Sequence, residues 1–442
     1  MCAVLNANEN KTNNKPNVLL ISIDALKMEF LLEQDRLGVK LPFLTSYFMD
    51  KGAIAVDGMK SVFPPFTYPC HQSMITGTNP KTHGITNNIM FDPMKKHKGA
   101  WHWFASRKVT TLWEAAKQAG YVSGSAAFPT SVGAKGDYIA PEFWWDGSAL
   151  DSEFIDVMSQ PQGLISEMEE VIGRYAGGLD LSDAGDVQRF KAARWLLSEK
   201  MSKSDRPFFM SAYFASFDES AHQFGVYSKE AAQSLEKIDA MVQQLVETAE
   251  EISGSNLIVC VVSDHGTLDN THCIYPNVVL EKAGLITVDE SGAVTAWKAF
   301  SQRAGGISEI RLAPEATEED RHVLEATLKE LAADENSGIL EVITGEQARE
   351  RGGFPKGDYI LIAKKGYEIR DEAYGEYVRT ELVQKAQHGY NEEFPEMRAS
   401  FMIAGRGIEP QVVHDVRLID VAPTLAAQMG AVLPHAEGRS IL

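Results

Sequence analysis

The sequence predicts an α/β protein: a doubly wound, mostly parallel sheet with helices on both faces, plus a smaller α+β cap insertion. Short, nearly continuous apolar stretches alternate with helical patterns along most of the chain, which is typical of a parallel sheet covered on both faces. Several of these stretches end directly in an acid or an acid–histidine pair. Ligands of open α/β sheets bind beyond the carboxyl ends of the strands, so the same pattern predicts a site at that edge.

The strands are predicted from their apolar content. Residues 18–23 form a nearly continuous apolar stretch that ends in Asp24, and residues 257–262 form a second one, followed by Asp264 and His265. Three further strands are expected at residues 121–128, 208–215 and 399–404.

Capping signals and apolar spacing predict the helices. Thr111 and Glu114 form a capping-box pattern at the start of a helix that Gly120 ends. Apolar residues at steps of three and four mark one face of a helix over residues 235–249. Two more helices are expected at residues 186–200 and 420–430.

The stretch at residues 65–71, Pro-Phe-Thr-Tyr-Pro-Cys-His, predicts a helix start. Thr67 is expected to cap this helix, with Pro69 in its first turn. The unpaired N–H groups and the dipole at such a start attract phosphate and stabilise an alkoxide. A lone threonine here would be an ordinary cap, so a functional interpretation depends on the acids and histidines elsewhere.

One region breaks the alternation of strands and helices. Between residues 282 and 387 the pattern changes to shorter strands around a charged helix that begins near Thr317. We therefore expect residues 1–281 and 388–442 to form the core, and residues 282–387 to form a cap that packs over its active edge.

Candidate metal ligands stand at three strand ends and in one later segment. Asp218 and His222 are four residues apart after the strand at 208–215, so one helical turn places them on the same face. Carboxylate oxygens and imidazole nitrogens together favour zinc or a similar transition metal over calcium or magnesium. The full set of candidates is Asp24, Asp218, His222, Asp264, His265 and His388.

The composition narrows the class of protein. With 442 residues, 44% of them hydrophobic, the chain can bury a large core. The formal net charge of -19 argues against a nucleic-acid surface, although a bound metal can still attract small phosphorylated molecules. The four cysteines show no paired spacing, and no apolar stretch approaches a membrane span. Residues 1–16 are polar and lack a secretory signal, so we expect a cytoplasmic protein; a lipoprotein processed at Cys2 is the alternative.

In combination and in order, these motifs resemble the nucleotide pyrophosphatase/phosphodiesterase (type I phosphodiesterase) family of the alkaline phosphatase superfamily. The resemblance covers residues 17–266 and 388–442. It implies two zinc ions per chain, divided between two ligand sets. One set is Asp218, His222 and His388; the other is Asp24, Asp264, His265 and the Thr67 oxygen.

The resemblance also implies roles for three residues around the helix start. Thr67 falls on the nucleophile, which forms a phosphothreonine that water then hydrolyses. Asn88 falls on the side chain that hydrogen-bonds a phosphoryl oxygen, and the Tyr68 N–H would be a second donor. No separate general base is needed, and we interpret His71, the nearest candidate, as a packing residue. His83 matches the turn that leads to Asn88, where we expect a structural role.

The chain departs from the family pattern at two positions. Cys70 replaces the usual asparagine, and we interpret it as a buried structural thiol. Tyr68 replaces a phenylalanine that forms one side of a nucleobase slot, and it can still stack. The candidates for the partner ring, each equally well explained as a core aromatic, are Phe128, Tyr138 and Trp144.

The sequence therefore predicts a two-metal phosphodiesterase or nucleotide pyrophosphatase that hydrolyses small organic or nucleotide phosphodiesters. Only neutral donors occur in the site motifs, which favours diesters over monoesters. The alternatives are a C–P hydrolase similar to phosphonoacetate hydrolase, a phosphomonoesterase of the same superfamily, and a catalytically silent metal-binding protein. The expected partner is a small phosphorylated substrate, without nucleic-acid duplex binding or a membrane span; the sequence does not predict an oligomeric state.

Overall fold

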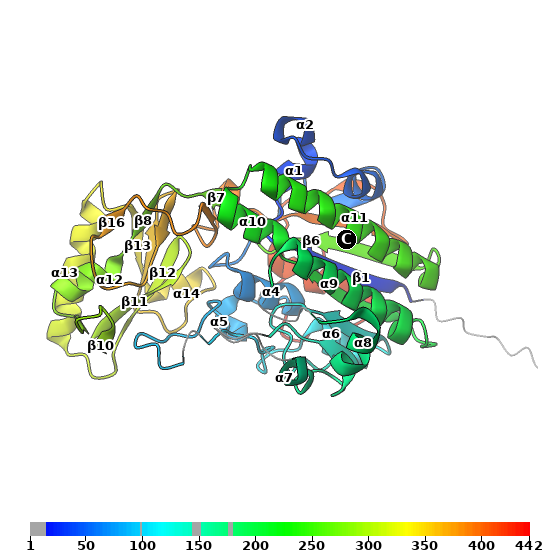
Figure 1. The fold of residues 1–442 in the computed structure, drawn as a ribbon, viewed down its shortest axis with the longest axis horizontal. Helices are drawn as coiled ribbons and strands as arrows, with labels where there is room; N and C mark the ends of the chain where they lie inside the picture. The colour runs from blue at the N-terminus through cyan, green and yellow to red at the C-terminus, as the bar shows by residue number, and fades with distance from the viewer. Residues whose placement is uncertain (1–14, 98–99, 144–151, 176–179) are drawn as a thin grey trace, which may run out of the picture.

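The computed structural model describes residues 15–97, 100–143, 152–175 and 180–442. A large sheet with its helices forms one part of the molecule, and a group of smaller sheets forms the other (Figure 1). Cys2 and Trp144, singled out in the sequence, lie outside the described residues. Within the described residues, no helix combines the length and apolar character that crossing a bilayer requires.

The large sheet confirms the predicted fold class. Its eight strands lie in the order β19-β2-β18-β6-β1-β5-β3-β4. The strands from β6 to β4 run parallel, whereas β18 runs antiparallel to β6. The bounds of the strands in this order are Gln411–Val412, Ala53–Ile54, Phe401–Gly405, Leu257–Val262, Asn17–Ile23, Phe208–Phe214, Val122–Ala126 and Tyr138–Ala140.

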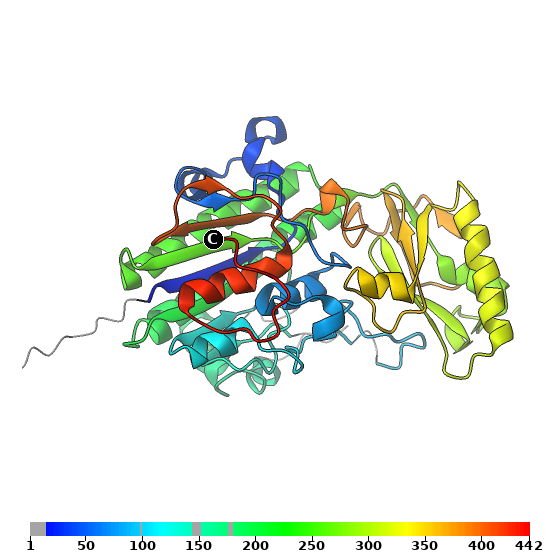
Figure 2. The same ribbon diagram turned by 180° about the vertical axis from the view of Figure 1, so that it is seen from behind.

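Helices cover both faces of this sheet because the side chains of β1 alternate between two apolar cores. Leu19 and Ile21 belong to the core on the face covered by α9 (Asp183–Trp195) and α11 (Lys229–Ser253), which lie in front in Figure 1. Val18 and Leu20 belong to the opposite core, with three helices seen from behind in Figure 2. These helices are α4 (Thr67–Thr76), α6 (Leu112–Gln118) and α15 (Val421–Met429). Each fully buried Leu or Ile stabilises the fold by roughly 1.5–3 kcal/mol.

The capping signals in the sequence agree with the structure at the start of α6 and fail at the start of α4. Thr111 caps α6 by accepting the Glu114 N–H, which is half of the predicted capping box. At α4 the prediction was wrong: the N-cap is Phe66, and Thr67 is the first helical residue without a side-chain cap hydrogen bond. The extended backbone of Phe66 starts the helix one residue earlier, so the Thr67 hydroxyl is not used by the helix.

The smaller part is built around a four-stranded antiparallel sheet in the order β11-β12-β14-β13. The bounds are Ala299–Ala304, Ile307–Leu312, Tyr359–Ala363 and Ile339–Thr344. The charged helix is α13 (Glu318–Ala333), which Thr317 caps with a full capping box. Strand pairing also reaches back before residue 282, because β8 (His272–Ile274) pairs with β15 (Tyr367–Ile369). We call this smaller part the cap.

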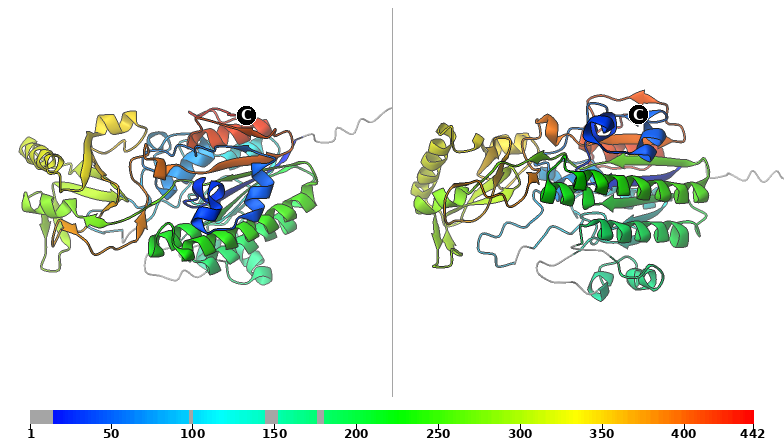
Figure 3. Two further views of the ribbon diagram at one scale, coloured as in Figure 1. Left: turned by 90° about the horizontal axis from the view of Figure 1, so that it is seen from above. Right: turned by 45° about the horizontal axis from the view of Figure 1, so that its top comes forward.

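The cap lies at the end of the core toward which β1 runs (Figures 1 and 3). Phe63 and Phe66, just before α4, pack against apolar side chains of the cap sheet. Gln302 of β11 donates to the carbonyl oxygens of Ile89 and Met90. The cap thus contacts the two core segments that carry Thr67 and Asn88.

The turn after β11 makes a close backbone contact between cap and core. Gly306 N–H donates to the His388 carbonyl oxygen at 3.1 Å. At Gly305, where φ is +71°, an added Cβ would lie 2.0 Å from the same oxygen. Only glycine therefore lets this turn approach the segment that carries His388.

We predict that Gly305→Ala lowers the free energy of unfolding by clearly more than the cost of a positive φ alone. The matched control is Gly284→Ala, because Gly284 has φ +74° and no heavy atom within 4 Å of the added Cβ. The control should cost about 1–2 kcal/mol. Chemical denaturation of both variants measures the difference, and equal costs would show that the contact with His388 is loose.

Candidate active site

Three neighbouring strands bring the predicted acids and histidines together. β6, β1 and β5 lie side by side, and Ser22 of β1 is in register with Val262 on one side and Tyr213 on the other. Their carboxyl ends therefore meet at one level of the sheet. Asp24 follows β1, Asp264 follows β6, and α10 (Ser216–Phe224) follows β5.

The first group of close ligand atoms contains Asp24, Asp264 and His265, whose candidate atoms all lie within 4.8 Å of one another. His265 Nε2 is 3.0 Å from Asp264 Oδ2 and 3.7 Å from Asp24 Oδ1. Thr67 Oγ1 is 3.4 Å from the same nitrogen. The four residues that the sequence assigned to one zinc are thus neighbours.

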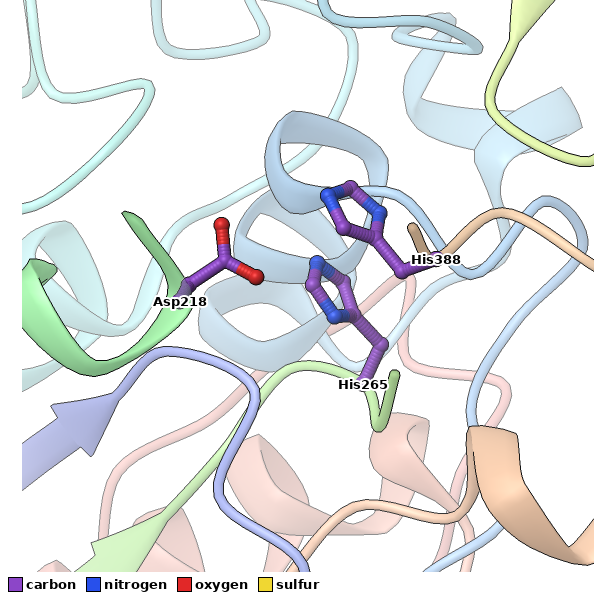
Figure 4. A group of neighbouring side chains, drawn as sticks. All are labelled: Asp218, His265 and His388. Atoms are coloured by element: carbon purple, nitrogen blue, oxygen red, sulfur yellow. The ribbon is translucent and has the colours of Figure 1, made fainter. Parts of the chain in front are cut away.

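The second group contains Asp218, His265 and His388 (Figure 4). The rings of His265 and His388 stack with centroids 3.8 Å apart, and the Asp218 carboxylate points toward them. His222 joins this group through Asp218, since its Nε2 lies 3.0 Å from Asp218 Oδ2. His265 therefore takes part in both groups, whereas the sequence placed it in one.

Burial and mutual charge shift the pKa values of these side chains. Burial, and then the charges of Asp264 and Asp218, raise the pKa of Asp24 well above its ordinary value. Burial opposes ionisation of Asp218 too, but His222 outweighs it and holds the pKa of Asp218 at about 2. Burial lowers the pKa of His222, but Asp218 raises it to about 9. Burial and His265 lower the pKa of His388 well below the usual range.

Buried polar atoms without partners indicate what the site can hold. Among the described residues, Asp24 Oδ1, Asp218 Oδ1 and His388 Nδ1 are buried without a hydrogen-bond partner, and Asp264 Oδ2 has His265 Nε2 at 3.0 Å as its neighbour. Leaving such atoms unsatisfied is costly, especially for charged groups. Divalent cations would satisfy these atoms and offset the carboxylate charges. Carboxylate oxygens with imidazole nitrogens are a donor set that fits zinc.

Thr67 and Asn88 lie together at the start of α4. Asn88 Oδ1 accepts the Tyr68 N–H at 2.8 Å, which places the Asn88 side chain beside the residue after Thr67. The Tyr68 N–H, expected as a donor to the substrate, is thus paired with Asn88 in this structure. The Nδ2 group of Asn88 is the donor that this arrangement leaves for another oxygen.

The residues interpreted as structural make structural contacts. His71 Nδ1 lies 2.8 Å from the Thr67 carbonyl oxygen, and its Nε2 lies 2.9 Å from Ser22 Oγ. Cys70 is fully buried, and burial raises the pKa of its thiol well above the usual range. His83 Nε2 lies 2.9 Å from Ser73 Oγ, and its Nδ1 accepts the Ile85 N–H, which fixes the turn before Asn88.

The side chain of Tyr68 differs from the expectation of an open stacking surface. It is 1% exposed, and its hydroxyl donates to Glu142 Oε2 at 3.1 Å. The neighbouring ring is Trp101, with centroids 5.5 Å apart, which the sequence did not indicate. Of the rings proposed as its partner, Phe128 packs on His71, and Tyr138 lies under Lys200.

Sequence reasoning also missed the polar residues behind the ligands. Tyr213 of β5 donates its hydroxyl to Asp24 Oδ2 at 2.5 Å. Asp186, Arg189 and Glu142 are buried nearby, each at most 1% exposed. The sequence signal that could have found such residues is a polar side chain within an expected apolar strand or helix face. This signal does not tell which residue the polar side chain will hydrogen-bond.

The doubly wound sheet, with acids, histidines and a threonine at its strand ends, places the protein in the alkaline-phosphatase-like α/β class. The model of the family described as type I phosphodiesterase/nucleotide pyrophosphatase matches residues 18–391, and the chain belongs to this family. The resemblance drawn from the motifs is confirmed.

Individual relatives are distant. The chain is 26% identical over 262 residues to human ectonucleotide pyrophosphatase/phosphodiesterase family member 1, covering 57% of this chain but 23% of that protein. It is 23% identical over 433 residues to the bis(5'-adenosyl)-triphosphatase ENPP4 of Pongo abelii, covering 95% of this chain and 79% of the relative.

A solved structure shows the same fold over nearly the full chain. Murine ectonucleotide pyrophosphatase/phosphodiesterase 5, described as an inactive threonine-to-alanine variant in complex with AMP, superposes with a TM-score of 0.63. The alignment covers 96% of this chain and 97% of that chain at 18% sequence identity. At this identity the likeness establishes the fold.

We predict that Glu142→Gln changes how stability depends on pH. Burial raises the pKa of Glu142 from 4.5 to about 8, with Arg189 and the Tyr68 hydroxyl acting against the shift. The folded state therefore keeps a proton that the unfolded state loses above pH 4.5, so this stabilisation falls as the pH rises through about 8. Glutamine stays neutral, and the variant should gain stability relative to wild type between pH 5 and pH 9.

Denaturant titrations of wild type and Glu142→Gln at pH 5 and at pH 9 measure this gain in stability. The expected gain is about 1.4 kcal/mol for each unit of difference between the folded and unfolded pKa of Glu142. Glu290→Gln, in an exposed turn of the cap, is the control for removing a carboxylate from the surface. A Glu142→Gln curve parallel to wild type would mean that Glu142 is ionised in the folded protein.

Proposed function

We propose that the protein is a zinc-dependent phosphodiesterase or nucleotide pyrophosphatase that acts through a phosphothreonine at Thr67. The observation that carries the proposal is the Thr67 hydroxyl at the start of α4, 3.4 Å from His265 Nε2 and outside the helix's own hydrogen bonds. Around it lie buried acids and histidines with unpaired ligand atoms. Because this hydroxyl makes no cap hydrogen bond, it can serve as a nucleophile in a way that a capping threonine cannot.

The donor set is consistent with two zinc ions. Asp218, His222 and His388 would hold one ion. Asp24, Asp264, His265 and the Thr67 oxygen would hold the other. When bound, such ions supply Lewis acidity that favours an ionised hydroxyl and stabilises charge on the phosphoryl and leaving oxygens. His265 is close to both groups and so links the two sets.

The chain's own residues position the reaction. The Thr67 oxygen attacks phosphorus, a Thr–O–P bond forms, and the bond to the leaving oxygen breaks as that oxygen takes up a proton. A water molecule then attacks the phosphorus, and the Thr67 hydroxyl is restored. Asn88 Nδ2 and the positive end of α4 would stabilise negative charge on the non-bridging oxygens.

Nucleotide-like diesters are the substrates that the site favours. Asn88 and the N–H groups at the start of α4 are neutral donors, so the site motifs add no cation for the extra charge of a monoester. Two relatives support a nucleotide: one is named as a bis(5'-adenosyl)-triphosphatase, and a second is described in complex with AMP. The description of the latter as inactive after a threonine-to-alanine change is in keeping with a threonine nucleophile.

We predict that Thr67→Ala abolishes hydrolysis of a nucleotide phosphodiester while the melting temperature stays close to wild type. The hydroxyl makes no cap hydrogen bond, so its loss costs the fold little. Thr67→Ser should keep partial activity because an alkoxide can still form. Rates are measured with a matched phosphodiester, phosphomonoester and phosphonate, and the diester should react fastest in wild type.

The control is Thr76→Ala in the last turn of the same helix. Thr76 Oγ1 donates to the Gln72 carbonyl oxygen at 2.7 Å, so this variant should lose stability but keep turnover. Near-normal diester rates in Thr67→Ala would rule out covalent catalysis at this residue. A monoester or phosphonate that reacts faster than the diester would overturn the diesterase assignment.

We predict that the purified protein holds about two zinc-like ions per chain, following the two-metal pattern of phosphoryl-transfer sites. Asp218→Asn removes a charge from one ligand set and should reduce the content to about one. Elemental analysis after dialysis measures both values. A preparation that is fully active with magnesium alone and contains no transition metal would contradict the assignment.

A further inference from the structure

A buried arginine lies behind the site. Arg189 of α9 is 1% exposed, and its Nη1 donates to Asp186 Oδ1 at 3.1 Å and to the Asp180 carbonyl oxygen at 2.8 Å. Its guanidinium lies 5.8 Å from the centre of the Tyr213 ring. None of these residues is among the candidate metal ligands.

Asp186 joins this arginine to the helix that carries two ligands. Its Oδ1 accepts the Ala215 N–H at 2.9 Å, and its Oδ2 accepts the Ser216 N–H at 2.8 Å. These N–H groups stand at the start of α10, where Ala215 is the N-cap and has no capping side chain of its own. A carboxylate supplied by α9 therefore caps α10 and favours its dipole. The first turn of α10 contains Asp218, and the next contains His222.

Two further interactions of Arg189 connect it with the other parts of the site. Tyr213, which faces Arg189, holds Asp24 by its hydroxyl. Glu142, whose pKa the charge of Arg189 lowers against the effect of burial, accepts the hydroxyl of Tyr68. Tyr68 follows Thr67 directly, so Arg189 acts on both ligand sets through Asp186 and Tyr213, and on the nucleophile segment through its charge near Glu142.

We propose that Asp186 and Arg189 are positioning residues for the metal centre: Asp186 sets the start of α10 and so the place of Asp218 and His222, and Arg189 holds Asp186. This proposal rests on the proposed function, because it takes Asp218 and His222 as zinc ligands. The pair acts through backbone and side-chain contacts and touches neither substrate nor zinc.

The competing explanation is that Asp186 and Arg189 only stabilise the fold. The burial of this ion pair does not by itself support that explanation. Taking two charges out of water costs more than their attraction returns unless further hydrogen bonds satisfy them, and apolar replacements are often as stable. Here the further hydrogen bonds go to the backbone that leads into two ligands. Partners behind metal ligands orient them, and their loss typically weakens metal binding by about 10- to 100-fold.

The test uses Asp186→Asn in the full-length protein, with Asp239→Asn as a matched control. Asp239 of α11 is likewise buried, and its two oxygens accept the successive N–H groups of Phe43 and Leu44, at 3.1 Å and 2.8 Å. In each variant the asparagine keeps one acceptor and presents an NH₂ group to the other N–H. Both variants therefore lose one contact between a carboxylate and a backbone N–H, at α10 in one case and away from the site in the other. Asp186→Asn also removes the charge that pairs with Arg189, so its loss of melting temperature should be the larger one.

Zinc affinity is measured by competition with a chromogenic chelator, beside the melting temperature and the diester rate at increasing zinc concentration. Both variants should lose melting temperature. Asp186→Asn should bind one of its two zinc ions about 10- to 100-fold more weakly, and added zinc should restore part of its rate. Asp239→Asn should keep wild-type zinc affinity. Equal zinc affinities in the two variants would overturn the positioning role.

Two further variants keep the outcomes separate. Asp218→Asn, measured in the same way, tests the ligand assignment: if it keeps both zinc ions at wild-type affinity, the proposed function fails. If it loses one and Asp186→Asn loses none, only the positioning role fails. Should Asp186→Asn not fold, Arg189→Lys retains the buried charge but loses the planar geometry. It is then expected to weaken zinc binding in the same direction, and unchanged affinity would overturn the proposal.

Discussion

The crowding of buried carboxylates at one edge of the sheet is the constraint on which the site depends. Asp24, Asp218 and Asp264 follow three adjacent strands; Asp24 and Asp264 are buried, and the side chain of Asp218 beside them is 13% exposed. Burial, and then the charges of Asp264 and Asp218, oppose the ionisation of Asp24 and raise its pKa well above the ordinary value. Divalent cations would offset this charge, and the unpaired oxygens of Asp24 and Asp218 are where they would bind.

The nucleophile depends on the same geometry from the other side. α4 starts at Thr67 because Phe66 is extended, and this leaves the threonine hydroxyl facing His265. His71, one turn later, ties the helix to Ser22 of β1 and to the Thr67 carbonyl oxygen. The position of the hydroxyl relative to the acids is therefore set by the central strand itself, through a contact that is fully buried.

Family membership and local detail answer different questions in this protein. The family model and the fold account for the family of the chain and for its sheet. The surroundings of Tyr68 come from the structure of this chain: its ring is buried beside Trp101, and its hydroxyl donates to Glu142. A shared fold does not decide substrate preference, which depends on the particular groups around a site.

The sequence by itself determined the strands, their acidic ends and the pairing of Asp218 with His222, because apolar runs and helical spacing are local properties. It also indicated the seven candidate ligands, which the structure brings together. Only the tertiary structure decided that β18 runs antiparallel, that Phe66 rather than Thr67 caps α4, and that His265 lies in both ligand groups. It alone revealed Trp101 beside Tyr68 and Asp186 at the start of α10. The contacts of Trp101 with Tyr68 and of Asp186 with α10 join residues about thirty positions apart in the chain, and the contacts among the ligands join residues still farther apart. No local pattern in the sequence encodes such contacts, because they form only when the completed sheet is packed.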